Sequence, residues 1–253
     1  MPADPIRWRW AAASRIGTSH IKAGTRKQDA YVARTLPDGT LCVIVSDGAG
    51  SAPFGGEGAS LVCRSMARNL GDWFTRHDRM PGEECIIEWI DGVRDTLSVV
   101  AEKREVTRRQ FAATLAMLVV GRGELMALQV GDSSIVARAK REWEAICWPD
   151  SGEFASTTYF VTDDPAVRLN SVRAPSTHDG FAVFSDGIET IALQQAELRP
   201  HPGFFGPMIR PIDAAEGAGK LINLSAALGR YLDGPAVCER TDDDKTLVLV
   251  SGA

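Results

Sequence analysis

Aspartates stand at the ends of strand-like apolar runs in this chain. Asp29 directly precedes the run 30–34, and Asp47 directly follows the run 41–46. A Pro-Asp-Gly sequence, typical of a tight turn, separates the two runs. Because antiparallel strands joined by a turn return to the same end, we expect Asp29 and Asp47 to lie close together.

Two further pairs of polar residues occupy the same kind of position. Thr114 lies near the start of one run, and Asp132 follows the run that returns. Asp186 ends a third run, and Asp243 precedes the last. The runs are 111–120, 125–130, 181–185 and 246–250. If the last two are antiparallel neighbours, all six polar side chains line a single rim of the fold.

Carboxylates gathered on one rim repel each other unless a cation neutralises them. A hard divalent ion does this, and a set of oxygen ligands suits Mg²⁺, Mn²⁺ or Ca²⁺ better than zinc. An Asp-Gly pair after a strand is also a common turn signal, so Asp47-Gly48 or Asp186-Gly187 alone would indicate only a turn. Their shared edge is what makes the set a candidate metal site.

The elements that would carry these residues alternate between strands and helices. Gly131-Asp132 is predicted to turn the chain into a further hairpin strand, 134–139. Apolar residues at spacings of three and four predict helices over 59–75 and 83–105, and a late helix over 214–232. Strands, two helices, more strands, a helix and a closing strand favour an α+β layer fold built on antiparallel sheet.

The bulk properties exclude some classes of protein. The 253 residues are 44% hydrophobic and 24% charged, with a formal net charge of −5. This composition is typical of a globular protein, and its mild acidity argues against non-specific nucleic-acid binding. No stretch approaches the roughly 20 apolar residues that cross a bilayer, so we expect no membrane partner.

The number and spacing of the cysteines indicate whether the protein works in a reducing or an oxidising compartment. The five cysteines are scattered, odd in number and without a CxxC pair. They are Cys42, Cys63, Cys85, Cys147 and Cys238. This pattern predicts buried free thiols and a reducing, cytoplasmic setting.

Six short motifs, in order along the chain, resemble those of the metal-dependent (type 2C, PPM) serine/threonine protein phosphatases. They are Gln28-Asp29-Ala30, Ser46-Asp47-Gly48-Ala49-Gly50, Ala113-Thr114-Leu115, Val130-Gly131-Asp132-Ser133, Phe184-Ser185-Asp186-Gly187 and Asp243-Asp244-Lys245-Thr246. The resemblance spans about 14–250, which implies one phosphatase domain over 1–253. Gly17-Thr18-Ser19-His20, ahead of the first motif, is similar to a compact bacterial subgroup.

The resemblance implies a four-layer αββα sandwich of two antiparallel sheets flanked by helices. It also implies two Mn²⁺ or Mg²⁺ ions and a metal-bridging hydroxide that attacks phosphorus. Asp47 would bridge the ions, and the Gly48 carbonyl would add a ligand to one of them. Asp186 and Asp243 would hold the other ion.

Other residues would support this centre. Asp29 would act mostly through water, and Asp132 would help to bind a weaker third metal. Thr114 belongs to the supporting set through its motif. Gln28 stands where many relatives carry glutamate, and its amide can contact metal-bound water without contributing charge.

The phosphate-binding half of the site departs from the family pattern. Gly24 stands where the family usually places an arginine that binds the substrate phosphate. We expect Arg26, or His20 with Lys22, to supply this contact. The alternative is that the basic residues here are solvated turn residues.

The expected function is hydrolysis of phosphoserine and phosphothreonine in protein substrates, opposing a bacterial Ser/Thr kinase or acting on its targets. A catalytically weak pseudophosphatase that binds a phosphoprotein or kinase is the main alternative. A metal-dependent nuclease or small-phosphate hydrolase is a third, although the acidic chain lacks an evident basic track for nucleic acid. Specificity is expected to reside in the irregular segments 148–165 and 194–211, and the oligomeric state stays open.

Overall fold

Two antiparallel sheets form the centre of the computed structural model, which describes residues 7–150 and 158–252. The six-stranded sheet has the order β12 (Gly219–Lys220), β1 (Trp8–Arg15), β13 (Lys245–Gly252), β9 (Gly180–Phe184), β6 (Ser134–Ala139) and β7 (Glu142–Cys147). The five-stranded sheet has the order β2 (Ala30–Thr35), β3 (Leu41–Ser46), β4 (Leu115–Gly121), β5 (Glu124–Val130) and β8 (Asn170–Pro175). Neighbouring strands are antiparallel except β12, which pairs with β1 in parallel.

Strand β3 shows why the two sheets must be covered on both faces. Successive side chains of a strand point to opposite faces, and all six residues of β3 are buried. Cys42 and Ile44 join the core beneath the helices, whereas Leu41, Val43 and Val45 join the core between the two sheets. A sheet with two apolar faces is stable only between two other layers.

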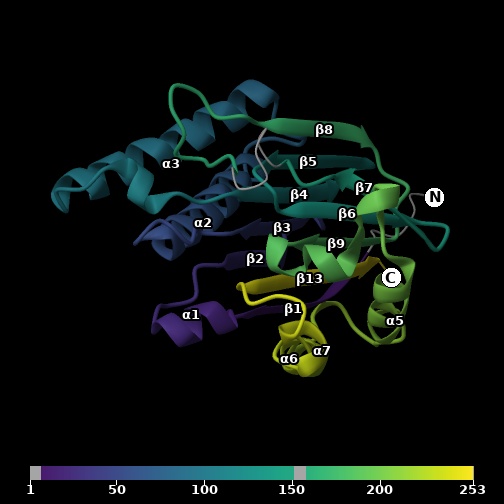
Figure 1. The fold of residues 1–253 in the computed structure, drawn as a ribbon. Helices are drawn as coiled ribbons and strands as arrows, with labels where there is room; N and C mark the ends of the chain where they lie inside the picture. Colours follow the sequence, from purple (N-terminus) through teal and green to yellow (C-terminus); the bar gives the residue numbers. More distant parts are fainter. Residues whose placement is uncertain (1–6, 151–157, 253) are drawn as a thin grey trace.

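Helices provide the two outer layers, as Figure 1 shows. Helices α2 (Gly55–Phe74) and α3 (Glu83–Lys103) cover the five-stranded sheet. Helices α5 (Pro202–Asp213) and α6 (Ile222–Leu232) cover the six-stranded sheet. The predicted α+β, four-layer αββα architecture is therefore confirmed.

The late part of the chain differs from its predicted structure. The helix expected over 214–232 begins only at Ile222, because Gly217 and Gly219 adopt positive φ angles of 86° and 87° before it. Helix α5 lies in the segment that we expected to be irregular, and it contains two internal prolines. Burial of Phe204, Phe205, Ile209 and Ile212 against the six-stranded sheet stabilises this helix despite the prolines.

Smaller differences concern the ends of elements. The strand expected over 111–120 begins at Leu115, because Arg108–Phe111 forms a 3-10 turn. Helix α2 begins at Gly55 instead of residue 59. Strands β1, β7 and β8 were not predicted. Of the segment 148–165, residues 151–157 lie outside the described residues.

The connection after β5 is not the hairpin that the sequence predicted. Strand β5 belongs to the five-stranded sheet and β6 to the six-stranded sheet. Gly131, with φ of 95°, lies where the chain crosses from one sheet to the other. Asp132 follows directly, so the crossover places its side chain at the rim between the sheets.

The five cysteines are free thiols, as predicted, but their burial differs. Cys42, Cys63 and Cys147 are buried, whereas Cys85 and Cys238 are half-buried. Burial raises the pKa of Cys42 and Cys147 to about 12, which makes these thiols unreactive near neutral pH. In the ranges 7–150 and 158–252, no helix is both long and apolar enough to cross a bilayer.

Candidate metal centre

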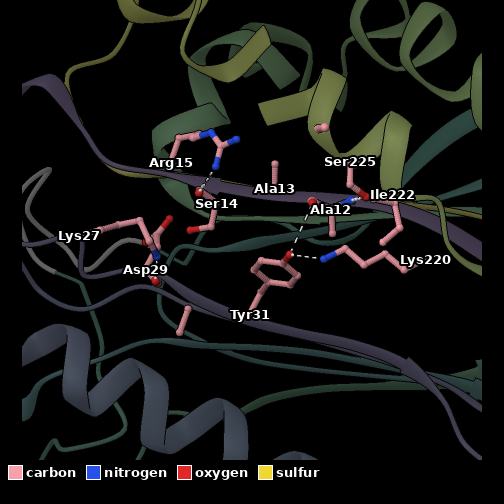
Figure 2. A pocket seen from close by; sticks show the side chains of 12 residues that line it. Ala12, Ala13, Ser14, Arg15, Lys27, Asp29, Tyr31, Lys220, Ile222 and Ser225 are labelled. Carbon is pink, nitrogen blue, oxygen red and sulfur yellow. Dashed lines mark hydrogen bonds between the residues drawn. The ribbon is translucent and has the colours of Figure 1, made fainter. Parts of the chain in front are cut away.

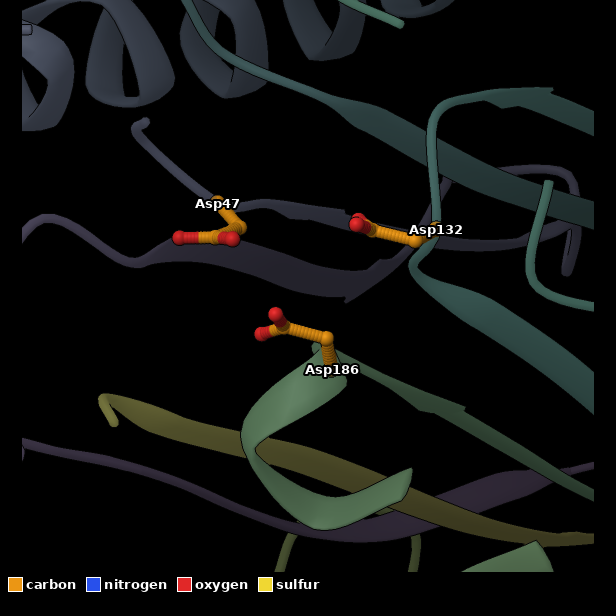
Figure 3. A group of neighbouring side chains, drawn as sticks. All are labelled: Asp47, Asp132 and Asp186. Atoms are coloured by element: carbon orange, nitrogen blue, oxygen red, sulfur yellow. The ribbon is translucent and has the colours of Figure 1, made fainter. Parts of the chain in front are cut away.

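Three carboxylates from distant parts of the chain converge at the rim between the sheets (Figure 3). Asp47 follows β3, Asp132 lies at the crossover before β6, and Asp186 begins a 3-10 turn after β9. One ligand oxygen from each of the three lies within 4.8 Å of the others. The cluster therefore draws on both sheets, which hold it in place from two sides.

Asp29 lies behind this cluster and is 4% exposed. Its Oδ2 accepts hydrogen bonds from Ser185 Oγ at 2.7 Å and from Thr246 Oγ1 at 2.6 Å. Its Oδ1 is buried without a hydrogen-bond partner among the described residues. Burial raises the pKa of this carboxyl, and the hydrogen bonds from Thr246 and Ser185 partly offset the rise.

Asp29 also lines a polar cavity at the sheet edges, between β1 and β2 (Figure 2). Lys27 Nζ donates to the Asp29 carbonyl on the same side. Farther along, Lys220 Nζ donates to Tyr31 Oη at 3.4 Å, and Tyr31 Oη donates to the Ala12 carbonyl at 3.5 Å. These bonds tie β12, β2 and β1 together next to Asp29.

The electrostatics of the cluster are uncompensated. Burial, reinforced by the charges of Asp29, Asp186 and Asp243, raises the pKa of Asp47 well above its usual value. Burial, reinforced by Asp132, Asp243 and Asp29, does the same to Asp186. The pKa of Asp132 is raised as well, chiefly by burial. No side-chain cation is hydrogen-bonded or ion-paired to these carboxylates in the described parts of the chain.

The cluster fits a divalent cation. Asp132 Oδ1 and Asp186 Oδ1 are buried oxygens without a partner in residues 7–150 and 158–252. An unpaired buried carboxylate oxygen is costly, and a hard cation that prefers oxygen ligands would satisfy several at once. The donor set is entirely oxygen, as Mg²⁺ and Mn²⁺ prefer.

Thr114 fixes the backbone that carries Asp47. The Asp47 N–H donates to Thr114 Oγ1 at 2.9 Å, and the Thr114 N–H donates to the Asp47 carbonyl at 2.8 Å. Thr114 Oγ1 also lies 3.2 Å from Ser133 Oγ, next to Asp132. The threonine thus links the backbone positions of two carboxylates from opposite sheets.

Gly48 is required by close packing next to Asp47. A Cβ at Gly48 would lie 2.3 Å from the carbonyl carbon of Gly55, at the start of α2. The first turn of α2 therefore lies directly against the residue whose carbonyl was the expected metal ligand. Gly48 also forms an isolated antiparallel bridge with Ala113.

Asp243 and Asp244 have different roles. Asp243 contributes to the raised pKa values of Asp47 and Asp186, so its charge lies near the cluster. Asp244 is 1% exposed and accepts hydrogen bonds from the backbone N–H groups of Gly17, Gln28 and Asp29. It therefore fastens the loop that carries Asp29 to the start of β13.

A family model for Protein phosphatase 2C matches residues 16–233. The chain belongs to the protein phosphatase 2C family. Serine/threonine-protein phosphatase 3 of Escherichia coli (strain K12) is 34% identical to this chain over 249 residues, which cover 96% of this chain and 98% of that protein.

Solved structures share the fold. The Staphylococcus aureus serine/threonine phosphatase Stp1 superposes with a TM-score of 0.64 at 16% identity, covering 96% of this chain and 94% of Stp1. The catalytic domain of the phosphatase PstP, solved in complex with two manganese ions, gives a TM-score of 0.66 at 16% identity, covering 98% of this chain and 99% of PstP. PppA of Pseudomonas aeruginosa gives 0.65 at 18% identity, with 98% of each chain covered.

The structure separates the three residues expected to bind phosphate in this protein phosphatase 2C family member. His20 Nδ1 lies 3.3 Å from Asp244 Oδ1, so its ring faces a carboxylate. Lys22 is exposed on the short helix α1 (Thr18–Ala23). Arg26 is exposed and lines a groove that Gln28 also lines. Only Arg26 thus shares a surface with a residue of the first acidic motif.

The backbone conformation at position 24 explains why this family member has glycine there and not arginine. Gly24 ends helix α1 with φ of 67°, in the left-handed region that favours glycine. An arginine here would be strained. Gln28, four residues on, donates from Nε2 to the Ala52 carbonyl at 3.0 Å, while its Oε1 is buried without a partner among described residues.

Sequence reasoning assigned no role to four residues that contact these aspartates. Ser185, Thr246 and Asp244 lay inside the quoted motifs, and their motif positions were the available signal. Thr158 donates from Oγ1 to Asp132 Oδ2, and it lies in the irregular segment where no pattern pointed to it.

Proposed function

We propose that this chain is a metal-dependent serine/threonine protein phosphatase that hydrolyses phosphoserine and phosphothreonine. The observation that carries the proposal is the convergence of Asp47, Asp132 and Asp186, with no cation hydrogen-bonded or ion-paired to them among residues 7–150 and 158–252. Family membership and the name of the Escherichia coli relative support the same reaction. A pseudophosphatase is not favoured, since the relative of 34% identity is named as a serine/threonine-protein phosphatase.

We infer a centre of two Mn²⁺ or Mg²⁺ ions and a weaker third. Asp47 would contribute to both main sites, with the Gly48 carbonyl on one and Asp186 and Asp243 on the other. Asp132 would serve the third. Such cations, when bound, make water acidic enough to attack near neutral pH and neutralise phosphoryl oxygens.

The residues of the chain would hold and orient the reacting groups. Thr114 fixes the backbone of Asp47 through two hydrogen bonds, so that this carboxylate is preorganised. Ser185 and Thr246 hold Oδ2 of Asp29 and leave Oδ1 free to accept a hydrogen bond from water in the site. Preorganised groups of this kind lower the barrier because they need not rearrange during the reaction.

Metal removal tests the proposal. We expect Mn²⁺-dependent hydrolysis of a phosphothreonine peptide and of a small aryl phosphate, and both activities should disappear in EDTA and return with added Mn²⁺. Full activity in EDTA would contradict the proposal. Binding of the phosphopeptide without turnover would instead support the pseudophosphatase.

Arg26 is our proposed contact for the substrate phosphate. It is the exposed candidate that lines the groove next to Gln28, whereas His20 faces Asp244. Arg26→Ala should raise KM for a small aryl phosphate, and His20→Ala and Lys22→Ala should leave KM unchanged. If Arg26→Ala changes neither KM nor kcat, the assignment is wrong.

The partners follow from this reaction. We propose phosphorylated proteins in the cytoplasm as substrates, namely a Ser/Thr kinase or its targets, and no membrane or nucleic-acid partner. The free thiols support a reducing compartment. Incubation of the phosphatase with a phosphorylated Ser/Thr kinase from the same organism, followed by intact mass, tests the kinase directly.

A further inference from the structure

A groove lies between helices α2 and α3, beside the loops that carry Asp29 and Asp47. Its cations are Arg26, Lys27, Arg64 and Arg104, and apolar residues such as Leu61 and Leu97 form part of its lining. We call this surface the basic groove. Its volume of about 860 Å³ is much larger than a phosphate group needs.

The basic groove is continuous with the loops of the metal centre. Gln28 directly precedes Asp29, and Gly50 belongs to the loop after Asp47; both line the groove. The hydrogen bond from Gln28 Nε2 to the Ala52 carbonyl joins the two loops into one wall. A polypeptide with its phosphoresidue at the carboxylates could therefore continue into the groove.

The charge of the groove differs from that of the whole chain. The chain has a formal net charge of −5, whereas the groove lining carries four cations and one carboxylate, Glu57. Arg64 is exposed on α2 and forms no salt bridge with residues 7–150 or 158–252. Such a local excess of positive charge attracts anionic groups.

Glu57 forms a salt bridge with one of these cations, Arg104. Arg104 donates to both Glu57 carboxylate oxygens, at 2.7 and 3.1 Å, and its guanidinium lies over the rings of Phe54 and Phe111. The hydrogen bonds from Arg104 and the charges of Arg104 and Arg26 lower the pKa of Glu57. The arrangement shows that the groove already holds one carboxylate in a planar, two-point contact.

We propose that the basic groove binds acidic side chains that flank the phosphoresidue in the protein substrate. This inference rests on the proposed phosphatase function and adds a substrate class to it. Arg64 is the open cation for such a side chain, and Glu57 competes with the substrate for Arg104. The apolar part of the lining packs against the aliphatic portions of the same segment.

Kinetics on matched phosphopeptides test the proposal. Three peptides carry the same phosphothreonine with acidic, neutral or basic flanks, and a small aryl phosphate reports the metal centre alone. The wild-type enzyme should show the highest kcat/KM for the acidic peptide. Arg64→Glu should raise KM for that peptide about five- to tenfold, and the aryl phosphate should be unaffected.

Arg68→Glu is the matched control. Arg68 is exposed on the same helix but does not line the groove, so this variant makes the same charge change elsewhere. It should leave the peptide preference intact. Equal effects of Arg64→Glu and Arg68→Glu, or no preference for the acidic peptide in the wild-type enzyme, would overturn the proposal.

Glu57→Gln has an expected effect of opposite sign. Releasing Arg104 should lower KM for the acidic peptide about two- to threefold, with little change for the neutral peptide. A raised KM for the acidic peptide would contradict competition by Glu57. If the wild-type enzyme hydrolyses neither the peptides nor the aryl phosphate, the proposed function is wrong. If it hydrolyses them without preferring the acidic peptide, only the proposed role of the basic groove is wrong.

Discussion

The two ends of strand β6 carry charge in opposite ways. At the C-terminal end of β6, Arg138 is only 8% exposed. Its guanidinium donates to Asp213 at 2.7 and 3.0 Å and to Asp179 at 2.9 Å. Ser251 Oγ donates to Asp213 at 2.6 Å as well. Although burial opposes ionisation of Asp213, these contacts hold its pKa below the usual value.

At the start of the same strand, Asp132 joins carboxylates to which no cation in the described part of the chain is hydrogen-bonded or ion-paired. The pKa values of Asp47 and Asp186 are raised, the reverse of the shift at Asp213. The network around Arg138 is complete, and its charges compensate one another within the protein. A partly buried carboxylate set that lacks countercharge among the described residues instead marks a place where a ligand must supply it.

The largest expected effect is on catalysis, at the end of β6 where the carboxylates lack a countercharge. Asp47→Asn removes the charge expected to contact both main metal ions, so kcat/KM for a small aryl phosphate in Mn²⁺ should fall by about a thousandfold or more. The metal-free protein should remain folded, because the change relieves repulsion. Activity within tenfold of the wild-type value would show that Asp47 does not carry the chemistry.

At the compensated end, Arg138→Met should destabilise the fold without affecting catalysis by the folded enzyme. The carboxylates of Asp213 and Asp179 that lose their partner are 38% and 55% exposed, so water screens them in part and the free energy of unfolding should fall by about 1–2 kcal/mol. Arg173→Met is the control, because the Arg173–Glu124 pair is 44% and 48% exposed and should contribute less than about 1 kcal/mol. Similar losses in urea denaturation of both variants would contradict the contrast.

The pH dependence of stability should follow the uncompensated end in metal-free protein. Asp47 and Asp186 have folded-state pKa values raised above the unfolded value of about 3.9. The folded state then binds more protons than the unfolded state, so this stabilisation is complete below the unfolded pKa and is lost as pH rises through the folded values. Denaturation in EDTA at several pH values should show that loss, and saturating Mn²⁺ should reduce it.

Local pattern was enough to predict most of the rim. Asp29 and Asp47 could be paired from one turn, and the aspartates of β9 and β13 could be paired once those strands were taken as neighbours, which the structure confirms. The spacing of apolar residues also predicted α2 and α3, because their buried residues recur every three or four positions.

Features that depend on distant contacts could not be predicted in this way. At Gly131 the chain passes from one sheet to the other, and a Gly-Asp sequence is equally compatible with a hairpin turn. Helix α5 contains prolines that argue against a helix, and only its burial against the six-stranded sheet stabilises it. The pairing of Arg138 with Asp213 joins residues 75 positions apart.

Thermal unfolding of wild type and Asp186→Asn, each in EDTA and in Mn²⁺, tests the central claim most directly. In EDTA the variant should be more stable by about 1–2 kcal/mol, because it removes a buried charge among like charges. Mn²⁺ should raise the Tm of the wild type strongly and that of the variant much less. A wild type that is the more stable protein in EDTA and gains nothing from Mn²⁺ would contradict a metal centre at these carboxylates.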